Sequence, residues 1–235
     1  MEELSTIQKI AVMAMPLVFA IVFHEVAHGW VANKLGDPTA KDLGRLTLNP
    51  IPHIDLIGTI IMPLLLYFGT NGQFVFGYAK PVPIDPRYFK DPKKGMALSS
   101  LAGPGINLLM AILFSLVLRV IFPALKESDL TDISGRALFP IALMLSYGVL
   151  INVALAVLNL VPVPPLDGSR IVYWLLPEKL GAAYYRLERF GMLILMALLI
   201  FRVLGAIIWP VVIYVLYFFL GQEILQFLVQ YLLSK

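Results

Sequence analysis

Long apolar runs with almost no charge are the feature that most constrains how this chain can fold. Three of them each reach the roughly 20 residues that an α-helix needs to cross the hydrocarbon core of a membrane. Hydrophobic residues make up 59% of the chain and charged residues 14%, whereas a soluble domain has about 45–50% and about 25%. Because this balance fits neither a soluble nor a disordered chain, we expect an integral membrane protein. The three predicted helices run from about Ile7 to Ala32, from about Lys94 to Phe122 and from about Ala137 to Val161.

Two further apolar stretches predict shorter or broken segments. Leu56 to Phe68 holds about 13 residues, which is short for a full span and predicts a re-entrant segment. The stretch from Arg189 to Leu233 is apolar throughout and predicts either one span with an interfacial helix or two spans broken near Gly205 and Pro210. A turn at Asn71-Gly72 predicts a short β-hairpin. The expected fold is an all-α polytopic membrane protein with about five to six transmembrane helices, a re-entrant segment and a short β-hairpin or edge.

Basic residues are spread unevenly over the loops, which predicts how the chain lies in the membrane. Loops 33–55, 79–95 and 163–189 together hold 12 of the 18 Lys and Arg residues, whereas loop 123–137 holds Lys126 and Arg136 alone. Because cytoplasmic loops carry the excess of Lys and Arg, we expect the first three loops in the cytoplasm and the N-terminus outside. The first helix has an acidic start and no small-residue cleavage site, so we expect it to be retained rather than removed as a signal peptide.

The composition also excludes several classes of chemistry. The chain has no cysteine, which removes disulfides, thiol catalysis, iron–sulfur clusters and cysteine-ligated zinc. Its 3 histidines, His24, His28 and His53, are too few for a membrane oxygenase built on many histidines. The net charge of +3 is small, and no basic cluster lies outside the loops that flank the apolar runs. Nucleic acid is therefore not an expected partner.

The segment His24-Glu25-Val26-Ala27-His28 forms an HExxH motif near the end of the first apolar run. Residues four apart share one face of a helix, so both imidazoles can bind one Zn²⁺ while Glu25 reaches a metal-bound water. Ionisable groups in an apolar helix are costly, which makes function their default interpretation. The alternative is a pair of histidines hydrogen-bonded inside a helix bundle, with Glu25 as their partner.

A catalytic zinc needs a third protein ligand and an open coordination position. No His or Glu lies at a suitable spacing just downstream of the motif, and Asp167 is the best candidate. It follows a proline-rich break after the third long helix and begins a shorter predicted helix that ends near Pro177. It is also expected on the same side of the membrane as His24 and His28. The alternative is that Asp167 caps the helix that begins there.

Three elements of the chain together resemble the site-2 protease family of intramembrane zinc metalloproteases, in the family's order and over roughly residues 10–190. They are Phe23-His24-Glu25-Val26-Ala27-His28-Gly29, Ala102-Gly103-Pro104-Gly105-Ile106-Asn107 and Asn159-Leu160-Val161-Pro162-Val163-Pro164-Pro165-Leu166-Asp167-Gly168. The resemblance implies that His24, His28 and Asp167 bind one Zn²⁺ per chain and that Glu25 is the general base. It also implies a compact form without a PDZ or CBS domain. We therefore expect residues 1–235 to form a single membrane-embedded metalloprotease domain, with a catalytic core at about 10–190 and C-terminal helices at about 189–233.

The same elements suggest roles for further residues. Asn159 is expected to donate a hydrogen bond to the tetrahedral oxyanion or to the substrate backbone, or else to cap the broken end of its helix. Asn107 is expected to contact the substrate backbone, or else to make an interhelical hydrogen bond. Gly103 and Gly105 are expected to let their helix pack closely against the zinc helix.

The segment around His53 and Asp55 is the least explained part of the sequence. These two residues are candidates for a second ion site or for gating access to the site. The alternative is a helix cap with ordinary loop hydrogen bonds. Two segments, Leu46-Thr47-Leu48 and Gln73-Phe74-Val75-Phe76, are candidates for an extended edge that holds an unwound substrate as an added strand.

The expected function is an intramembrane zinc endopeptidase that cleaves transmembrane segments of other membrane proteins within the lipid bilayer. The charge pattern of the loops predicts an active site toward the cytoplasm. The resemblance and the compact size imply a prokaryotic plasma (inner) membrane, and the resemblance implies an upstream protease that cuts the same substrate first. Two alternatives remain. One is a non-catalytic zinc-binding scaffold, which would have no need for Glu25. The other is a metal transporter, which usually repeats its polar sites across inverted halves, whereas this chain has no internal repeat.

Overall fold

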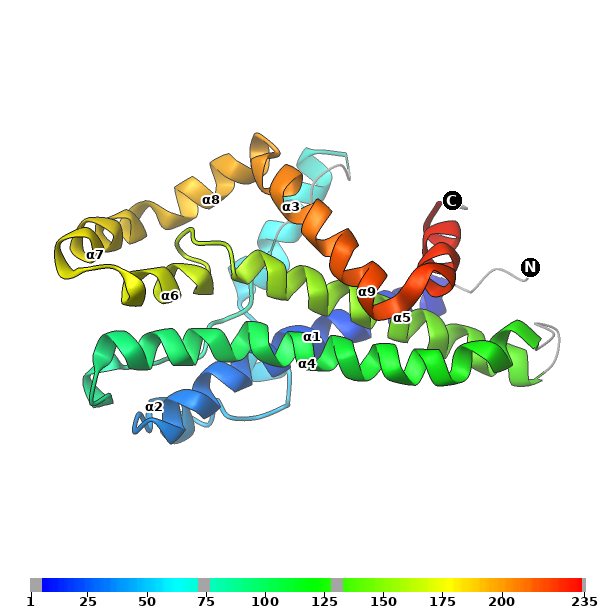
Figure 1. Ribbon diagram of the computed structural model, residues 1–235, viewed down its shortest axis with the longest axis horizontal. Helices are drawn as coiled ribbons and strands as arrows, with labels where there is room; N and C mark the ends of the chain where they lie inside the picture. Colours follow the sequence, from blue (N-terminus) through cyan, green and yellow to red (C-terminus); the bar gives the residue numbers. More distant parts are fainter. Residues whose placement is uncertain (1–5, 72–76, 128–132, 234–235) are drawn as a thin grey trace.

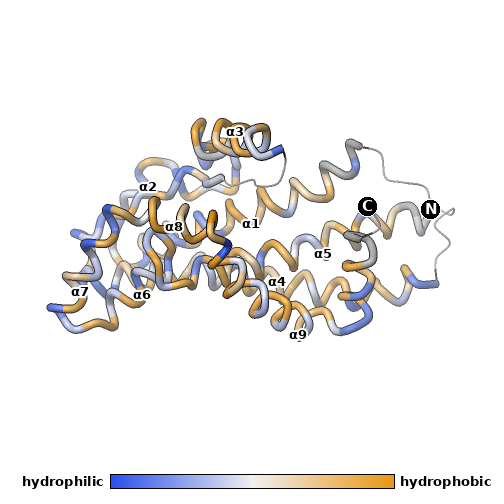
Figure 2. The backbone as a smooth tube through the Cα atoms, turned by 90° about the horizontal axis from the view of Figure 1, so that it is seen from above, coloured by the Kyte–Doolittle hydropathy of each residue, from blue (hydrophilic) through white to orange (hydrophobic). Residues whose placement is uncertain are grey.

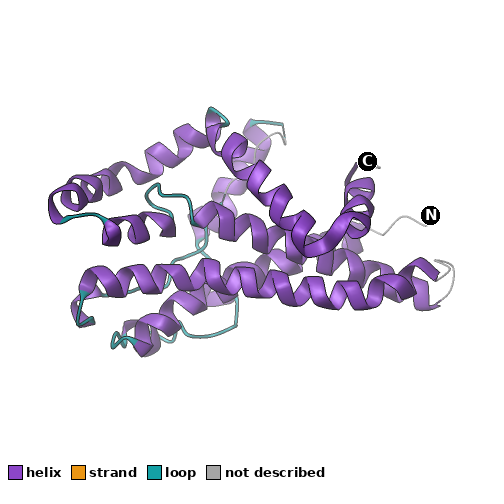
Figure 3. Ribbon diagram, viewed as in Figure 1, coloured by secondary structure: helices purple, strands orange, loops and turns teal. Residues whose placement is uncertain are grey.

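Four long apolar helices form the body of the molecule. The computed structural model describes residues 6–71, 77–127 and 133–233. Each of the four helices holds a stretch long and apolar enough to cross a membrane, which fits the predicted integral membrane protein. Figure 3 shows helices and loops, and the described residues include no strand. The four helices are α1 (Thr6–Lys34), α4 (Pro92–Glu127), α5 (Ile133–Asn159) and α9 (Val203–Leu233).

The prediction of five to six transmembrane helices is wrong for the described residues, which give four. Two apolar stretches fold into helices too short to span. The π-helical turn η2 (Leu56–Ile61) continues directly into α3 (Met62–Gly69), and α8 (Gly191–Ile200) has 10 residues. At about 1.5 Å per residue, a helix of this length covers roughly half of a hydrocarbon core about 30 Å thick. The re-entrant course of residues 56–69 stays a prediction.

The described C-terminal stretch holds one candidate span, in α9, preceded by the shorter helix α8; the interfacial position predicted for a shorter helix here stays a prediction. The break between α8 and α9 falls at Arg202, whose φ is 58°, just before the expected position at Gly205. Pro210 lies inside α9. A second bend occurs at Gly221, whose φ is 76°, a conformation that glycine adopts without strain. The guanidinium of Arg119 donates to the carbonyl oxygens of Phe218 and Phe219, at 2.7–3.2 Å, and so satisfies carbonyls near this bend.

The helices α1, α4 and α5 lie side by side, and α9 packs across α4 and α5 (Figure 1). The largest apolar core lies among α4, α5 and α9, and it includes the fully buried residues Leu118, Val149, Val153 and Val212. On the outer side of α4, Val120 is 79% exposed. In water such a side chain would be costly, but it suits contact with lipid tails.

The shorter helices within the basic loops gather at one end of the bundle, away from the start of α1 and the end of α9 (Figures 1 and 2). Hydrophilic residues are frequent at this end, whereas residues in the middle of the long helices are mostly hydrophobic (Figure 2). The basic loops therefore lie on a common side, as the charge pattern predicts. The helices at this end are α2 (Thr39–Asp42), α6 (Asp167–Leu175) and α7 (Glu178–Tyr185).

Candidate metal centre

The two histidines of the HExxH motif lie one turn apart on α1, on a face that is closed off from solvent. His24 is 7% exposed and His28 is 8% exposed. Helix α4 covers this face at Gly103, where a Cβ would lie 2.5 Å from the ring of His28 and 2.6 Å from that of His24. The predicted close approach is thus confirmed for Gly103. It is wrong for Gly105, where a Cβ would meet nothing within 4 Å, because this residue is on the exposed side of α4.

Asp167 reaches the histidines because the chain turns sharply after α5. That helix ends at Asn159, and the prolines that follow cannot continue it. A Cβ on Gly168 would lie 2.3 Å from the carbonyl oxygen of Leu160, so only glycine lets the start of α6 fold back against the end of α5. The side chain of Asp167 does not cap α6, since no side-chain cap is made there. The turn instead directs this carboxylate toward α1.

Three potential metal-binding atoms converge where α1 and α6 meet. The Nε2 atoms of His24 and His28 are 3.0 Å apart, and they lie 3.2 Å and 3.3 Å from Oδ2 of Asp167. Oδ2 is buried and accepts no hydrogen bond from the described residues. Among the described residues, these three side chains form the one group of His, Asp or Glu close enough to hold a metal ion.

The hydrogen bonds of His28 determine which ring nitrogen is free for a metal. Its Nδ1 lies 2.7 Å from the backbone oxygen of Ser99. A carbonyl oxygen can only accept, so Nδ1 carries a proton, and in the neutral imidazole Nε2 presents a lone pair. This carbonyl therefore orients the ring in the manner of the outer partners of metal-bound histidines.

A chain of amides fixes His24 in the same way. Nδ1 of His24 lies 2.6 Å from Oδ1 of Asn107. The amide nitrogen of Asn107 donates to the Ala20 carbonyl at 3.1 Å and to Oδ1 of Asn152 at 2.8 Å, and the Asn152 amide nitrogen donates to the Gly148 carbonyl at 2.8 Å. Oδ1 of Asn107 is thus the acceptor, and Nδ1 of His24 must donate. Asn107 therefore makes interhelical hydrogen bonds, the second of the two roles expected from the sequence. Its contact with the substrate backbone stays a prediction.

Three lone pairs therefore face one another at 3.0–3.3 Å. Electron-rich atoms this close repel unless a proton or a metal ion lies between them. Zinc bonds of about 2.0–2.1 Å in a tetrahedron place neighbouring ligand atoms about 3.3 Å apart. The two imidazoles and the carboxylate thus fit a zinc ion in both chemistry and spacing, and three protein ligands leave one position open for water or substrate.

Glu25 lies on a different face of α1 and does not bond to the histidines. Its Oε2 accepts a hydrogen bond from the backbone N–H of Val82 at 2.8 Å. Val82 belongs to a loop segment ahead of α4 that has neither helix nor strand. The alternative in which Glu25 is the hydrogen-bond partner of the two histidines is wrong, because Asn107 and Ser99 take that role.

The other predicted site residues have local partners. The amide nitrogen of Asn159 donates to the Leu155 carbonyl one turn earlier, at 3.0 Å, so an oxyanion role stays a prediction. Asp55 caps η2 by accepting from the N–H groups of Ile57 and Gly58, as in the alternative interpretation.

Nε2 of His53 bonds to the carbonyl of Thr47 at 2.9 Å, and His53 belongs to no metal-binding group among the described residues. A gating role for His53 and Asp55 stays a prediction. Of the two predicted edges, 46–48 forms no strand and 73–76 lies outside the described residues.

Two contributors to the site, Ser99 and Val82, were missed because they act through backbone atoms, which no side-chain pattern reveals. Asn152 was missed although it carried a signal. It is a polar residue within the apolar run of α5 and is fully buried, and such a residue needs a hydrogen-bond partner inside the bundle.

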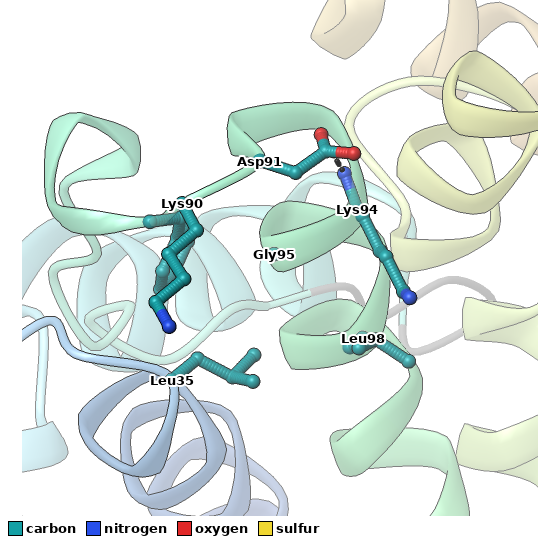
Figure 4. A pocket seen from close by; sticks show the side chains of 7 residues that line it. Leu35, Lys90, Asp91, Lys94, Gly95 and Leu98 are labelled. Atoms are coloured by element: carbon teal, nitrogen blue, oxygen red, sulfur yellow. Dashed lines mark hydrogen bonds between the residues drawn. The ribbon is translucent and has the colours of Figure 1, made fainter.

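A cavity of about 400 Å³ lies elsewhere, between the end of α1 and the start of α4 (Figure 4). Leu35, Gly95 and Leu98 line it together with the two lysines Lys90 and Lys94. The backbone N–H of Lys94 donates to the carboxylate of Asp91 at 3.0 Å. None of the three converging ligands lines this cavity, so it is separate from the metal centre.

Two histidines and an aspartate around one point, with a glutamate next to the first histidine, define the site of a zinc metalloprotease. The model of Peptidase family M50 matches residues 12–202. The chain belongs to this family, the site-2 protease family, as its motifs predict. It is 36% identical over 198 residues to Putative zinc metalloprotease YwhC of Bacillus subtilis (strain 168), with 84% of each chain covered.

More distant relatives carry a similar name. The chain is 27% identical over 183 residues to Putative zinc metalloprotease Rip2 of Mycolicibacterium smegmatis, covering 78% of this chain and 64% of the relative. It is 26% identical over 149 residues to Rip2 of Mycobacterium tuberculosis, covering 63% and 51%. No solved structure matches the chain.

Proposed function

We propose that this protein is an intramembrane endopeptidase that cleaves transmembrane segments of other membrane proteins, with one zinc per chain and Glu25 as the general base. The observation that carries the proposal is the convergence of the His24, His28 and Asp167 lone pairs. Both histidines lie within the candidate span Ala11–Lys34. A hydrolytic site inside a membrane span acts most directly on a peptide bond in the same membrane.

The proposed division of labour follows from the two faces of α1. Zinc held by the two histidines and Asp167 would supply a Lewis acid that lowers the pKa of a bound water. Glu25 receives a proton from the attacking water and returns it to the leaving amine. The Val82 N–H binds Oε2 of Glu25 and not Oε1. We therefore assign Oε1 as the oxygen that carries the proton. Asn159 is assigned to the oxyanion, which requires its amide to leave Leu155 when substrate binds.

The proposed orientation places the metal centre toward the cytoplasm. The basic loops share one end of the bundle (Figure 1), and the positive-inside rule assigns that end to the cytoplasm. His24 and His28 lie in the half of α1 that leads to this end, so the path for water is short. The proposed location is a prokaryotic plasma membrane, and the proposed partners are the surrounding lipids, the substrate and an upstream protease that trims it.

The test is cleavage by purified protein in proteoliposomes. A panel of single-span transmembrane proteins, labelled at both ends, serves as substrate, and soluble casein serves as the comparison. We expect zinc-dependent cleavage within the span of panel members, no cleavage by Glu25→Gln, and casein left intact. Cleavage of casein alone would replace the intramembrane substrate with a soluble one. Zinc-loaded protein that cleaves neither would support the scaffold alternative instead.

A further inference from the structure

We propose that Arg45 is a positioning residue for Glu25, and that it acts by clamping the backbone that carries the Val82 N–H. The inference rests on the proposed role of Glu25 as general base. It concerns the loop segment Lys80–Val82, here named the strap. Hydrogen bonds next to the HExxH helix join the strap to residues 45–59. The proposed function leaves residues 45–59 unexplained.

The strap lies against the face of α1 that carries Glu25 and Gly29, one turn apart. A Cβ on Gly29 would lie 2.7 Å from Cγ1 of Val82 and 2.7 Å from Cδ2 of Leu46. Both distances are shorter than real carbon contacts, so a larger residue at position 29 would displace the side chains of Val82 and Leu46. The glycine that follows the HExxH motif thus permits this backbone to approach Glu25.

The strap offers Glu25 a single donor. Pro81 and Pro83 have no N–H, so the Val82 N–H is the one backbone donor of residues 81–83. It donates to Oε2 of Glu25 at 2.8 Å, and the Val82 side chain is 7% exposed. The position of this carboxylate therefore depends on where the strap backbone is held.

Arg45 holds the strap at the two carbonyls that precede Val82. Its Nη2 donates to the Lys80 carbonyl at 2.8 Å and to the Pro81 carbonyl at 3.3 Å. The Arg45 backbone is itself anchored, since its N–H donates to the Ala40 carbonyl at 2.8 Å.

Other bonds fix the chain on either side of the clamp. The Lys80 N–H donates to the His53 carbonyl at 2.9 Å, and the Asp85 N–H donates to the fully buried carboxylate of Asp37 at 2.7 Å. The Tyr78 N–H donates to the Gly58 carbonyl at 3.0 Å. These bonds fix the segment as a whole, whereas Arg45 acts next to Val82.

The surroundings of Arg45 favour a positioning role over a stabilising one. Arg45 is 9% exposed, and its Nε is buried without a hydrogen-bond partner among the described residues. A buried charge that meets carbonyls instead of a carboxylate, with one N–H unpaired, opposes folding. A methionine of similar length would avoid that cost. We therefore expect the loss of Arg45 to change the geometry at Glu25 more than the stability of the fold.

Two pairs of variants test the clamp. Arg45→Met removes the guanidinium, and Arg45→Lys restores one donor. Val82→Pro removes the N–H that Glu25 uses, and Val82→Ala keeps it. Proline fits this position because Pro83 already holds residue 82 in an extended conformation. Arg186→Met, at an exposed arginine that directly follows α7, is the matched control.

The first readout is single-turnover cleavage in proteoliposomes, together with zinc content and melting temperature. We expect Arg45→Met and Val82→Pro to lower the rate constant between about tenfold and about hundredfold, the cost of a misplaced catalytic group. KM and zinc content should stay at the wild-type values. Arg45→Lys should recover part of the loss, and Val82→Ala should lose less activity than Val82→Pro, while Arg186→Met should stay within about twofold of wild type. A wild-type rate in Arg45→Met, or an equal loss of zinc in that variant, would overturn the inference.

The second readout does not need activity. Pro81 and Pro83 have no amide hydrogen, so the Val82 amide is the one exchanging backbone group in residues 81–83. Its hydrogen bond to Glu25 should slow its hydrogen exchange in the wild type. We expect exchange to speed up at least about tenfold in Arg45→Met, because the bond then opens more often. Unchanged exchange in this variant would refute the clamp even if no substrate is cleaved. A protein that shows the exchange effect but keeps full cleavage in Glu25→Gln would refute the proposed function instead.

Discussion

On one face of α1, His24 and His28 are oriented by groups from long helices. On the neighbouring face, Glu25 is held by the backbone of a loop. The partners on the histidine face, Asn107 and the Ser99 carbonyl, belong to α4, and Asn107 and Ser99 are fully buried. The partner of Glu25 is an N–H in a segment without helix or strand. The candidate metal ligands and the proposed base are thus supported by different parts of the chain.

The different supports of the two faces suit what each face is proposed to do. A metal site requires ligand atoms fixed within a fraction of an ångström, and packed helices supply that rigidity. A base must exchange protons with water and substrate, and a loop at the end of the bundle leaves room for both. Substitutions on the two faces should therefore have separable effects, one on zinc and one on turnover.

The largest separation is expected for Glu25→Gln. The change keeps the size of the side chain and an oxygen for the Val82 N–H, but it removes the base. Cleavage should fall by about 10³-fold or more, within the range for general-base catalysis. Zinc content, measured by atomic emission on the purified protein, should remain that of the wild type. Loss of zinc in this variant would mean that the two faces are not independent.

A smaller effect, on zinc affinity instead of cleavage, is expected for Asn107→Leu. The variant leaves Nδ1 of His24 without its acceptor and Oδ1 of Asn152 without its donor. Loss of such an outer partner typically lowers metal affinity about 10–100-fold, which competition with a fluorescent chelator measures. Asn152→Leu should act in the same direction, since it removes the next amide. Wild-type affinity in both variants would leave the amide chain with a purely structural role.

The glycine pair on α4 offers a matched comparison within one helix. A Cβ at Gly103 would collide with both histidine rings, whereas one at Gly105 would meet nothing within 4 Å. Gly103→Ala should lower the free energy of unfolding by about 1–3 kcal/mol, as overpacking does, and should weaken zinc binding. Gly105→Ala should be neutral or slightly stabilising, because alanine favours helix by about 1 kcal/mol. Equal effects in thermal unfolding would contradict the described packing of α4 on α1.

The smallest expected effect concerns the far end of α6. Nζ of Lys93 donates to the carbonyl of Leu176 at 2.9 Å and lies 4.6 Å from the centre of the Tyr173 ring. A cation at a helix C-terminus contributes about 0.3–1 kcal/mol, so Lys93→Met should weaken zinc binding about two- to fivefold through Asp167. Lys94→Met is the control, because its side chain lines the separate cavity (Figure 4). A larger effect in the control than in Lys93→Met would contradict this assignment.

The sequence predicts the histidine face better than the glutamate face. HExxH and Asp167 are side-chain signals, and the spacing of a helix or the chemistry of a ligand set makes them recognisable. The clamp on Glu25 is made of carbonyls and one N–H, and its single side chain, Arg45, looks like an ordinary basic loop residue. Long helices are predicted for a similar reason. The expected Lys94 to Phe122 run lies inside the observed α4, Pro92–Glu127.

The errors in the predicted fold have a common cause. Apolarity shows that a stretch avoids water, but it does not show how far the helix continues. The stretches 56–69 and 191–200 are apolar yet end early, so the helix count was too high. Gly105 was assigned to the helix interface because it shares a motif with Gly103. Two positions further on, the helix has turned by about 200°, which places it on the opposite side.

The most direct test is the zinc content of detergent-purified protein, with wild type beside Asp167→Ala. The three ligand atoms at 3.0–3.3 Å have the spacing and chemistry of a zinc site, so we expect the wild type to hold about one zinc per chain. The variant should lose most of it, because two histidines alone bind zinc weakly. Wild-type protein that stays free of zinc after reconstitution, or a variant that keeps as much zinc as wild type, would contradict the three-ligand site.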